Sequence, residues 1–245
     1  MKQGIFTIAE NIALTDSVMK MTLVGDVSDI TASGQFINIL LDGLYLRRPI
    51  SVFDRDETSV TIIYKVVGKG TEKMKQMTVG EKLDVLTGLG NGYDLSLSGE
   101  KPLLLGGGVG VPPLYLLAKK LIAEGKTPTV VLGFNTKSEI FCEEDFKALG
   151  VKTLVATADG SYGVKGFVTD AMKELDYDYF YTCGPEPMLR AIYSAAKTEG
   201  QFSFEERMGC GFGACMGCSC KTVTGYKRIC KDGPVLRKEE ILWEK

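Results

Sequence analysis

The sequence predicts an antiparallel β-barrel, then a doubly wound parallel-sheet α/β domain, and last a small cysteine-rich domain. Three observations predict this order. Residues 1–98 contain short runs rich in β-branched and aromatic residues, residues 99–205 alternate strand-like and helical segments, and residues 206–245 hold five of the seven cysteines. A chain of 245 residues is long enough for two compact domains and a small third one.

Composition and charge exclude several classes of function. The net charge is -2, with acidic and basic residues interspersed, so no basic surplus for nucleic acid is present. The longest apolar run, 103–118, is broken by glycines and prolines and does not predict a membrane span, and residues 1–14 contain no secretory apolar region. We therefore expect a cytoplasmic protein, in which clustered cysteines indicate metal or redox chemistry. The absence of histidine excludes Ser-His-Asp catalysis and any His-ligated metal.

The first block predicts a closed barrel or a sandwich. Turn residues separate its short strands, and a single helix is expected near Gly70–Met77. The strands are expected at Gly4–Glu10, Val18–Val24, Gln35–Leu41, Ser59–Val66 and Glu81–Leu86, and the segment Asp54–Glu57 is expected to be a turn.

Two segments of this block have the chemistry of a diphosphate site. Arg47–Ser51 sets two cations beside a hydroxyl after a strand, and Tyr64–Thr71 ends a strand with an aromatic ring, a cation and a Gly-Thr turn. The tyrosine is of the type that stacks on a flat ring. Each segment taken alone is also consistent with surface basic residues near turns.

The second block predicts the doubly wound sheet. Strands are expected at Lys101–Leu105, Thr129–Phe134, Thr153–Thr157, Tyr177–Thr182 and Gln201–Phe204, with helices at Pro112–Glu124, Glu143–Leu149, Thr169–Leu175 and Pro187–Thr198. The loop Leu103–Pro113 and the turn Tyr181–Leu189 each follow a strand and open a helix, which suits a pyrophosphate. The loop lacks the usual G-x-G-x-x-G spacing, and tight packing explains such glycines as well.

The strongest motif is the cysteine cluster. Cys210, Cys215 and Cys218 have C-x4-C-x2-C spacing, with Cys230 further on, which is the plant-type arrangement for a 2Fe–2S cluster. A four-thiolate zinc site is the alternative, although zinc sites usually pair two C-x2–4-C units. Cys220 competes with Cys230 as the fourth ligand, and the remote position of Cys230 favours the latter.

Together these motifs resemble the ferredoxin–NADP reductase superfamily and, within it, the electron-transfer subunits of NAD-dependent dihydroorotate dehydrogenase B. The resemblance covers essentially the whole chain. It implies a flavin-binding barrel, a nicotinamide-binding α/β domain and a C-terminal 2Fe-2S cluster domain, with boundaries at 1–98, 99–205 and 206–245. The cofactors implied are FAD, a 2Fe-2S cluster and NAD.

The resemblance also implies the site residues. FAD would be bound by Arg48, Pro49, Ile50, Ser51, Ile63, Tyr64, Lys65, Gly70 and Thr71. The nicotinamide nucleotide would face Gly107, Gly108, Gly110, Cys183, Gly184 and Pro185. The metal ligands would be Cys210, Cys215, Cys218 and Cys230. Ile50 stands where the wider superfamily has an aromatic residue, which puts ring stacking there in doubt.

The implied partner is an FMN-containing dihydroorotate dehydrogenase catalytic subunit, in a heterotetramer of two plus two. Electrons would pass from its FMN through the cluster and FAD to NAD⁺, as a step of pyrimidine biosynthesis. Two other hypotheses remain: the small subunit of a ferredoxin-dependent NADP or sulfhydrogenase-type oxidoreductase, and a redox sensor without turnover. After the second strand of the α/β domain, residues 134–138 show neither an acidic ribose anchor nor an arginine, so the residues leave NAD against NADP open.

Overall fold

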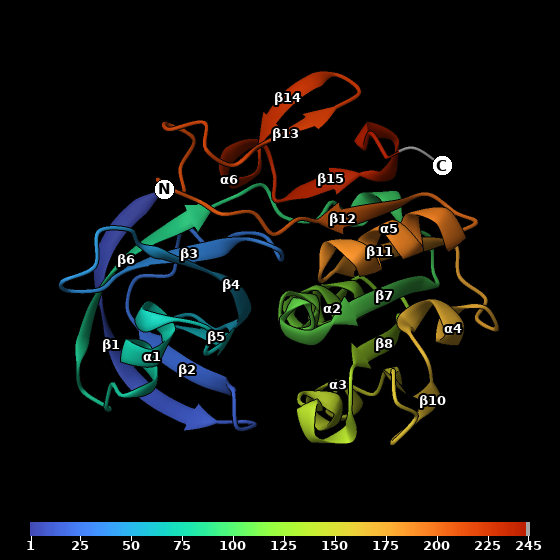
Figure 1. The fold of residues 1–245 in the computed structure, drawn as a ribbon, viewed down its shortest axis with the longest axis horizontal. Coiled ribbons are helices and arrows are strands. Elements are labelled where there is room, and N and C mark those ends of the chain that lie inside the picture. The colour runs from blue at the N-terminus through green and yellow to red at the C-terminus, as the bar shows by residue number, and fades with distance from the viewer. Residues whose placement is uncertain (244–245) are drawn as a thin grey trace.

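The computed structural model describes residues 1–243 and contains a closed barrel, a seven-stranded sheet and a two-stranded hairpin in the C-terminal segment (Figure 1). A barrel is built from the first 89 residues, and a sheet flanked by helices follows it. The C-terminal segment, red in Figure 1, lies across one end of both. This agrees with the fold class that the sequence predicts.

The barrel has the strand order β1-β2-β5-β4-β3-β6, with every neighbouring pair antiparallel. Alternate side chains point inward and fill it with aliphatic and aromatic residues such as Ile37, Ile39 and Ile62. One helix, α1, follows β5. The elements are β1 (Lys2–Ala13), β2 (Val18–Val24), β3 (Phe36–Leu40), β4 (Arg48–Arg55), β5 (Ser59–Lys65), α1 (Lys69–Lys75) and β6 (Lys82–Leu89).

Strand β4 corrects the sequence prediction. The segment that starts with Arg48 is expected from the sequence to follow a strand, but it is itself a strand that continues into the predicted turn at Asp54. Polar and charged residues at both ends of β4 hide its short apolar centre, Val52–Phe53.

The α/β domain is doubly wound. Its sheet has the order β10-β9-β8-β7-β11-β12-β15, parallel from β10 to β12, so the strand order reverses between β7 and β11. Helices α2 and α3 cover one face and α4 and α5 the other. The elements are β7 (Pro102–Gly107), α2 (Pro113–Ala123), β8 (Thr129–Phe134), α3 (Glu143–Ala148), β9 (Lys152–Thr157), β10 (Val164–Lys165), α4 (Val168–Met172), β11 (Tyr179–Cys183), α5 (Glu186–Ala195) and β12 (Gly200–Ser203). Short 3-10 turns lie at Leu95–Leu97, Gly108–Gly110 (η2) and Lys137–Glu139 (η3).

The C-terminal segment is more regular than its sequence suggests. It contains a hairpin of β13 (Ser219–Thr222) and β14 (Gly225–Arg228), the one-turn helix α6 (Ile229–Asp232), β15 (Val235–Arg237) and a 3-10 turn at Lys238–Glu240. Strand β15 pairs antiparallel with β12 and so extends the sheet of the α/β domain.

The barrel and the α/β domain are joined by direct side-chain contacts. The rings of Phe53 on β4 and Tyr115 on α2 stack with centroids 4.4 Å apart and an interplanar angle of 15°. One turn further, Lys119 pairs with Asp54 at 2.7 Å. Among residues 1–243, no helix has the length and apolar character needed to cross a bilayer.

Candidate functional site

The predicted flavin residues lie where two barrel strands separate. The β4–β5 ladder begins at the pair Val52–Ile62 and continues to Arg55. Residues 49–51 precede this pair on β4, and residues 63–65 follow it on β5, so the two triplets face each other without pairing. Each triplet pairs on its other side, with β3 or β2. Backbone N–H and C=O groups on the facing edges are therefore available to a ligand.

Arg48, Gly70 and Thr71 meet at one end of this opening. A Cβ atom built on Gly70 would lie 2.0 Å from Arg48 Nε, so the guanidinium passes directly over the glycine. Thr71 Oγ1 accepts the backbone N–H of Val67 at 2.9 Å and caps α1. A cation, a hydroxyl and the start of a helix thus lie together, as an anionic group requires. The neighbouring Arg47 instead pairs with Asp84 at 2.8 Å.

Two side chains among the predicted flavin residues point away from this opening, into the barrel core. Tyr64 is buried in the barrel core, where its hydroxyl donates to Asn11 Oδ1 at 3.1 Å and burial raises its pKa to about 12. Ile50 packs against the same core. The stacking role that the sequence suggests for Tyr64 is therefore wrong in this structure, because its ring lies inside the barrel. Ile63 faces outward and belongs to the same apolar cluster as Val111, and β5 lies beside η2.

The predicted nicotinamide turns lie side by side at the point where the strand order reverses. Gly107 ends β7, Cys183 ends β11, and the two strands are parallel neighbours. A Cβ on Gly110 would lie 2.3 Å from the Cys183 carbonyl oxygen. Ligands of open α/β sheets bind at such a reversal, beyond the carboxyl ends of the strands.

Close packing explains some of these glycines and not others. Gly107 and Gly184 lie against Met188 and each other, and Gly110 lies against the second turn. Gly108 has a φ of +52°, and a Cβ atom built on it would have no heavy atom within 4 Å, so packing does not account for it. Its open backbone is where a pyrophosphate can approach. The Cys183 thiol is buried, which raises its pKa well above the usual range.

A residue that the sequence analysis missed is Glu139. The turn η3 folds it back onto the end of β8, where its Oε2 accepts the backbone N–H of Asn135 at 3.2 Å and the side-chain amide at 2.9 Å. Asp159, at the end of β9, lies beside it because its N–H donates to the Asn135 carbonyl at 3.2 Å. Lys137 lies over the ring of Tyr162. The sequence does not reveal this acid, because Glu139 comes five residues after the last residue of β8 and reaches the end of that strand only through the turn η3.

The four predicted cluster ligands form two pairs. Cys210 and Cys215 are linked by backbone N–H groups that point at each other's sulfur atoms at 3.4 Å, and the Cys230 N–H points at Cys218 Sγ, also at 3.4 Å. Among residues 1–243, no three Cys, Asp or Glu side chains converge as a single metal ion requires. Two thiolate pairs fit a two-iron cluster.

The loop that carries these cysteines is shaped for sulfur chemistry. Gly211 and Gly213 have φ values of +80° and +92°, which turn the loop so that its amides face inward. Burial tends to raise the pKa of Cys210, but backbone N–H groups, those of Cys215 and Phe212 foremost, lower it to about 6. Burial and the neighbouring Cys218 raise the pKa of Cys230 to about 12. Arg228 braces the loop by donating to the Gly213 carbonyl at 2.9 Å.

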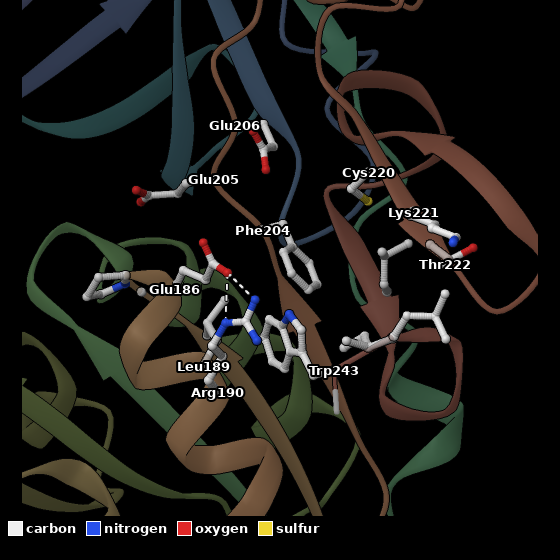
Figure 2. Close-up of a pocket in the computed structure, with 15 residues that line it drawn as sticks. Glu186, Leu189, Arg190, Phe204, Glu205, Glu206, Cys220, Lys221, Thr222 and Trp243 are labelled. Atoms are coloured by element: carbon white, nitrogen blue, oxygen red, sulfur yellow. Dashed lines mark hydrogen bonds and ion pairs between the residues drawn. The ribbon is translucent and has the colours of Figure 1, made fainter. Parts of the chain in front are cut away.

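Cys220 lies on β13, outside the two pairs. It lines a cavity of about 350 Å³ between α5, the segment after β12 and the hairpin. Figure 2 shows Cys220 and Lys221 on one wall of this cavity and Glu186 and Arg190 on the other. Arg190 pairs with Glu186 and lies 5.0 Å from the ring of Trp243. This position disfavours Cys220 as the fourth ligand.

Two family models match the chain. Residues 205–242 match the iron-sulfur cluster binding domain of dihydroorotate dehydrogenase B. Residues 104–194 match the oxidoreductase NAD-binding domain. Both matches fall on the segments described above, the paired cysteines and the two glycine turns.

Solved structures share the fold. The chain aligns over 98% of its length with 90% of an NADH-dependent reduced ferredoxin–NADP oxidoreductase studied for flavin-based electron bifurcation, at 32% identity and a TM-score of 0.88. It also aligns over 80% of its length with 90% of a ferredoxin NADP⁺ reductase from Neisseria gonorrhoeae, at 15% identity and a TM-score of 0.70. The second likeness concerns the fold alone.

Curated relatives are more similar. A protein of Fusobacterium nucleatum is 46% identical, with 96% of each chain covered, and one of Bacillus pumilus is 45% identical, with 98% of each covered. Both are electron transfer subunits of dihydroorotate dehydrogenase B (NAD⁺). This chain therefore belongs to the family of dihydroorotate dehydrogenase B (NAD⁺) electron-transfer subunits.

Proposed function

We propose that this protein carries electrons between NAD⁺ and an FMN-containing dihydroorotate dehydrogenase catalytic subunit, with FAD and a 2Fe–2S cluster as its cofactors. The observation that carries the proposal is the convergence of three sites in one chain. Strand β5 lies beside η2, and strand β3 contacts the cysteine loop through Asn38. When bound, FAD exchanges single electrons with a cluster and electron pairs with a nicotinamide, which is why all three sites are needed.

The barrel residues bind and orient the flavin. Arg48 supplies positive charge for the diphosphate, and Gly70 leaves room for the guanidinium beside Thr71. The backbones of Pro49, Ile50 and Ser51 and of Ile63, Tyr64 and Lys65 offer hydrogen bonds along the opening between β4 and β5. The side chains of Tyr64 and Ile50 keep the barrel core closed behind this edge.

The two glycine turns bind the nicotinamide nucleotide. Gly107, Gly108 and Gly110 let the pyrophosphate approach the start of α2. Cys183, Gly184 and Pro185 form the facing wall, and the buried thiol keeps water away from the reacting ring. Glu139 and Asp159 favour NAD over NADP, because two carboxylates repel a 2′-phosphate and an acid at this position accepts a hydrogen bond from the ribose 2′-hydroxyl.

Cys210, Cys215, Cys218 and Cys230 would hold the cluster as two pairs of thiolates. Phe212 and Met216 of the same loop are exposed apolar residues, 43% and 54% accessible. Exposed apolar side chains beside a redox centre suit a protein partner, and we assign the catalytic subunit to this face. The assembly we propose is a heterotetramer of two plus two.

Anaerobic co-purification with a dihydroorotate dehydrogenase catalytic subunit tests the function. The complex is expected to show flavin absorbance, the EPR signal of a reduced 2Fe–2S cluster, and NAD⁺ reduction that depends on dihydroorotate. A protein that contains zinc and no flavin contradicts the proposal.

A second candidate is favoured by the 32% identity to the ferredoxin–NADP oxidoreductase. In that case the chain is the small subunit of such an enzyme. Reduction of NADP⁺ by reduced ferredoxin with a different co-purifying subunit, and no turnover with dihydroorotate, supports it over the first candidate.

A further inference from the structure

The cysteine segment rests on the outer face of the barrel. Phe36, Leu86 and Leu89, from β3 and β6, share one apolar cluster with the buried thiols of Cys218 and Cys230. On the ribbon the segment lies above β3 and β6 (Figure 1). The barrel thus supports the cluster ligands as well as the flavin residues.

Asn38 makes the polar contact in this interface. Its side chain is 1% exposed, and its Nδ2 donates to the carbonyl oxygen of Cys210 at 3.2 Å. Gly211 has a φ of +80° and lies so close that a Cβ there would be 2.3 Å from Asn38 Nδ2. The amide therefore fixes the peptide that follows the first cluster ligand.

The same asparagine adjoins the flavin residues. On β3, Ile37 and Ile39 point into the barrel, so Phe36 and Asn38 point outward. In the β3–β4 ladder Asn38 pairs with Pro49 and Phe36 with Ser51. Paired residues of adjacent strands have Cβ atoms about 5 Å apart, so one strand step separates Asn38 from the flavin edge.

The side-chain oxygen of Asn38 indicates that this residue is not there to stabilise the fold. Among residues 1–243, no donor reaches its Oδ1, although the atom is fully buried. A buried acceptor without a partner destabilises a fold, and a leucine of similar size would remove this acceptor while also taking the Nδ2 donor from the Cys210 carbonyl. An asparagine at this position is therefore explained by what its Nδ2 holds.

A second tie keeps the segment docked independently of Asn38. Asn91, just after β6, donates its Nδ2 to the Val235 carbonyl at 2.9 Å and accepts the Val235 N–H at 3.2 Å. Its own N–H donates to the Gly233 carbonyl at 2.7 Å. Loss of the Asn38 bond is therefore expected to shift the Cys210 loop and leave the C-terminal segment in place.

We propose that Asn38 is a positioning residue that holds the first cluster ligand against the flavin strand and so sets the rate of electron exchange between cluster and flavin. The proposal rests on the proposed function, because it presumes both cofactors. A hydrogen-bond partner of a metal ligand of this kind typically changes affinity or activity by about 10-fold or more when it is removed.

The test compares Asn38→Leu and Asn38→Asp in the protein loaded with FAD and cluster. Stopped-flow absorbance follows flavin reduction and cluster reduction by NADH, EPR-monitored titration gives the cluster midpoint potential and g-values, and thermal unfolding gives Tm. We expect flavin reduction at the wild-type rate, cluster reduction about 10-fold slower, and altered g-values in both variants. The Leu variant is expected to have a Tm close to that of the wild type, because it removes the unpaired Oδ1 together with the Nδ2 hydrogen bond.

Gln35→Met is the matched control. Gln35 is buried, and its side-chain amide bonds only to main-chain groups of the loops next to β3 and β6. It accepts the N–H groups of Thr31 and Ala32 and donates to the Gly90 carbonyl. This variant is expected to lower Tm and leave cluster reduction unchanged. Wild-type cluster reduction in both Asn38 variants, or equal slowing in Gln35→Met, overturns the inference. A wild-type protein whose flavin NADH does not reduce contradicts the proposed function itself.

Discussion

In the nucleotide turns, packing requires one glycine, and another leaves the backbone open to a ligand. Gly110 faces the Cys183 carbonyl at van der Waals contact, whereas Gly108 faces open space with a left-handed backbone. The sequence shows equivalent glycines in one short loop, and only the fold separates their roles. Substitution by alanine therefore has two different physical consequences.

Gly110→Ala is expected to destabilise the protein by about 3 kcal/mol, because its Cβ would overlap main chain that cannot move without separating the two turns. Gly108→Ala is expected to cost only about 1 kcal/mol, the strain of a left-handed alanine. Gly108→Ala should nonetheless weaken NADH binding. Urea unfolding and NADH titration of both variants measure this, and equal stability losses contradict the assignment.

Glu139 predicts the coenzyme preference. Glu139→Gln keeps an acceptor for Asn135 but removes a negative charge that opposes a 2′-phosphate. We expect the ratio of kcat/KM for NADPH to that for NADH to rise about 10-fold, since a charge contact in solvent is worth about 1 kcal/mol per unit charge and a 2′-phosphate carries about 1.5 negative charges. Glu144→Gln, on the exposed face of α3, is the control and should leave the ratio unchanged. An unchanged ratio in Glu139→Gln removes this residue from the specificity site.

At the scale of elements, the sequence predicts those strands and helices that apolar periodicity and spacing mark. Strand β8 was predicted to the residue at both ends, and the helices of the α/β domain within a few residues, because apolar runs mark them. Strand β4 was not predicted, because its partners β3 and β5 supply the burial that its own polar ends do not show. The sequence predicts the Tyr64 ring beside the ligand and the fold turns it into the barrel core, because a strand end does not reveal which face its side chain takes.

The cysteine segment yields an element-scale prediction about the fourth ligand. Cys230 lies in the one-turn helix α6 beside Cys218, whereas Cys220 faces a cavity from the hairpin. Cys220→Ser is expected to retain the visible absorbance and EPR signal of the cluster, and Cys230→Ser to lose both. The ratio of iron to FAD in each variant measures how much cluster it retains. Cluster loss in Cys220→Ser with retention in Cys230→Ser would reverse the assignment.

At the scale of the whole molecule, the barrel and the α/β domain are held together by α2 against β4. The Phe53–Tyr115 stack and the Lys119–Asp54 ion pair lie one helical turn apart on this contact. The relation between the flavin and nicotinamide sites depends on it, since β4 and the loop before α2 carry one site each. Sequence patterns describe each domain separately and do not encode such a contact.

Tyr115→Ala tests the contact between the domains. The ring also meets Phe146 edge-on at 5.5 Å, so its removal leaves an apolar gap between the domains. We expect a loss of about 2 kcal/mol in unfolding free energy, less than for a fully buried aromatic residue, together with slower flavin reduction by NADH. Tyr45→Ala, at a residue 98% exposed, should change neither quantity. Unaltered stability in Tyr115→Ala would mean that other contacts hold the domains.

Strand β15 has a consequence for how the molecule is made. It covers the β12 edge of the parallel sheet, yet it emerges from the ribosome after all four cluster cysteines. Until it docks, β12 presents an uncovered edge of the kind that recruits other chains. Release of the last residues from the ribosome therefore ends the period in which β12 can pair with another chain, because β15 then occupies that edge and Asn91 holds it there.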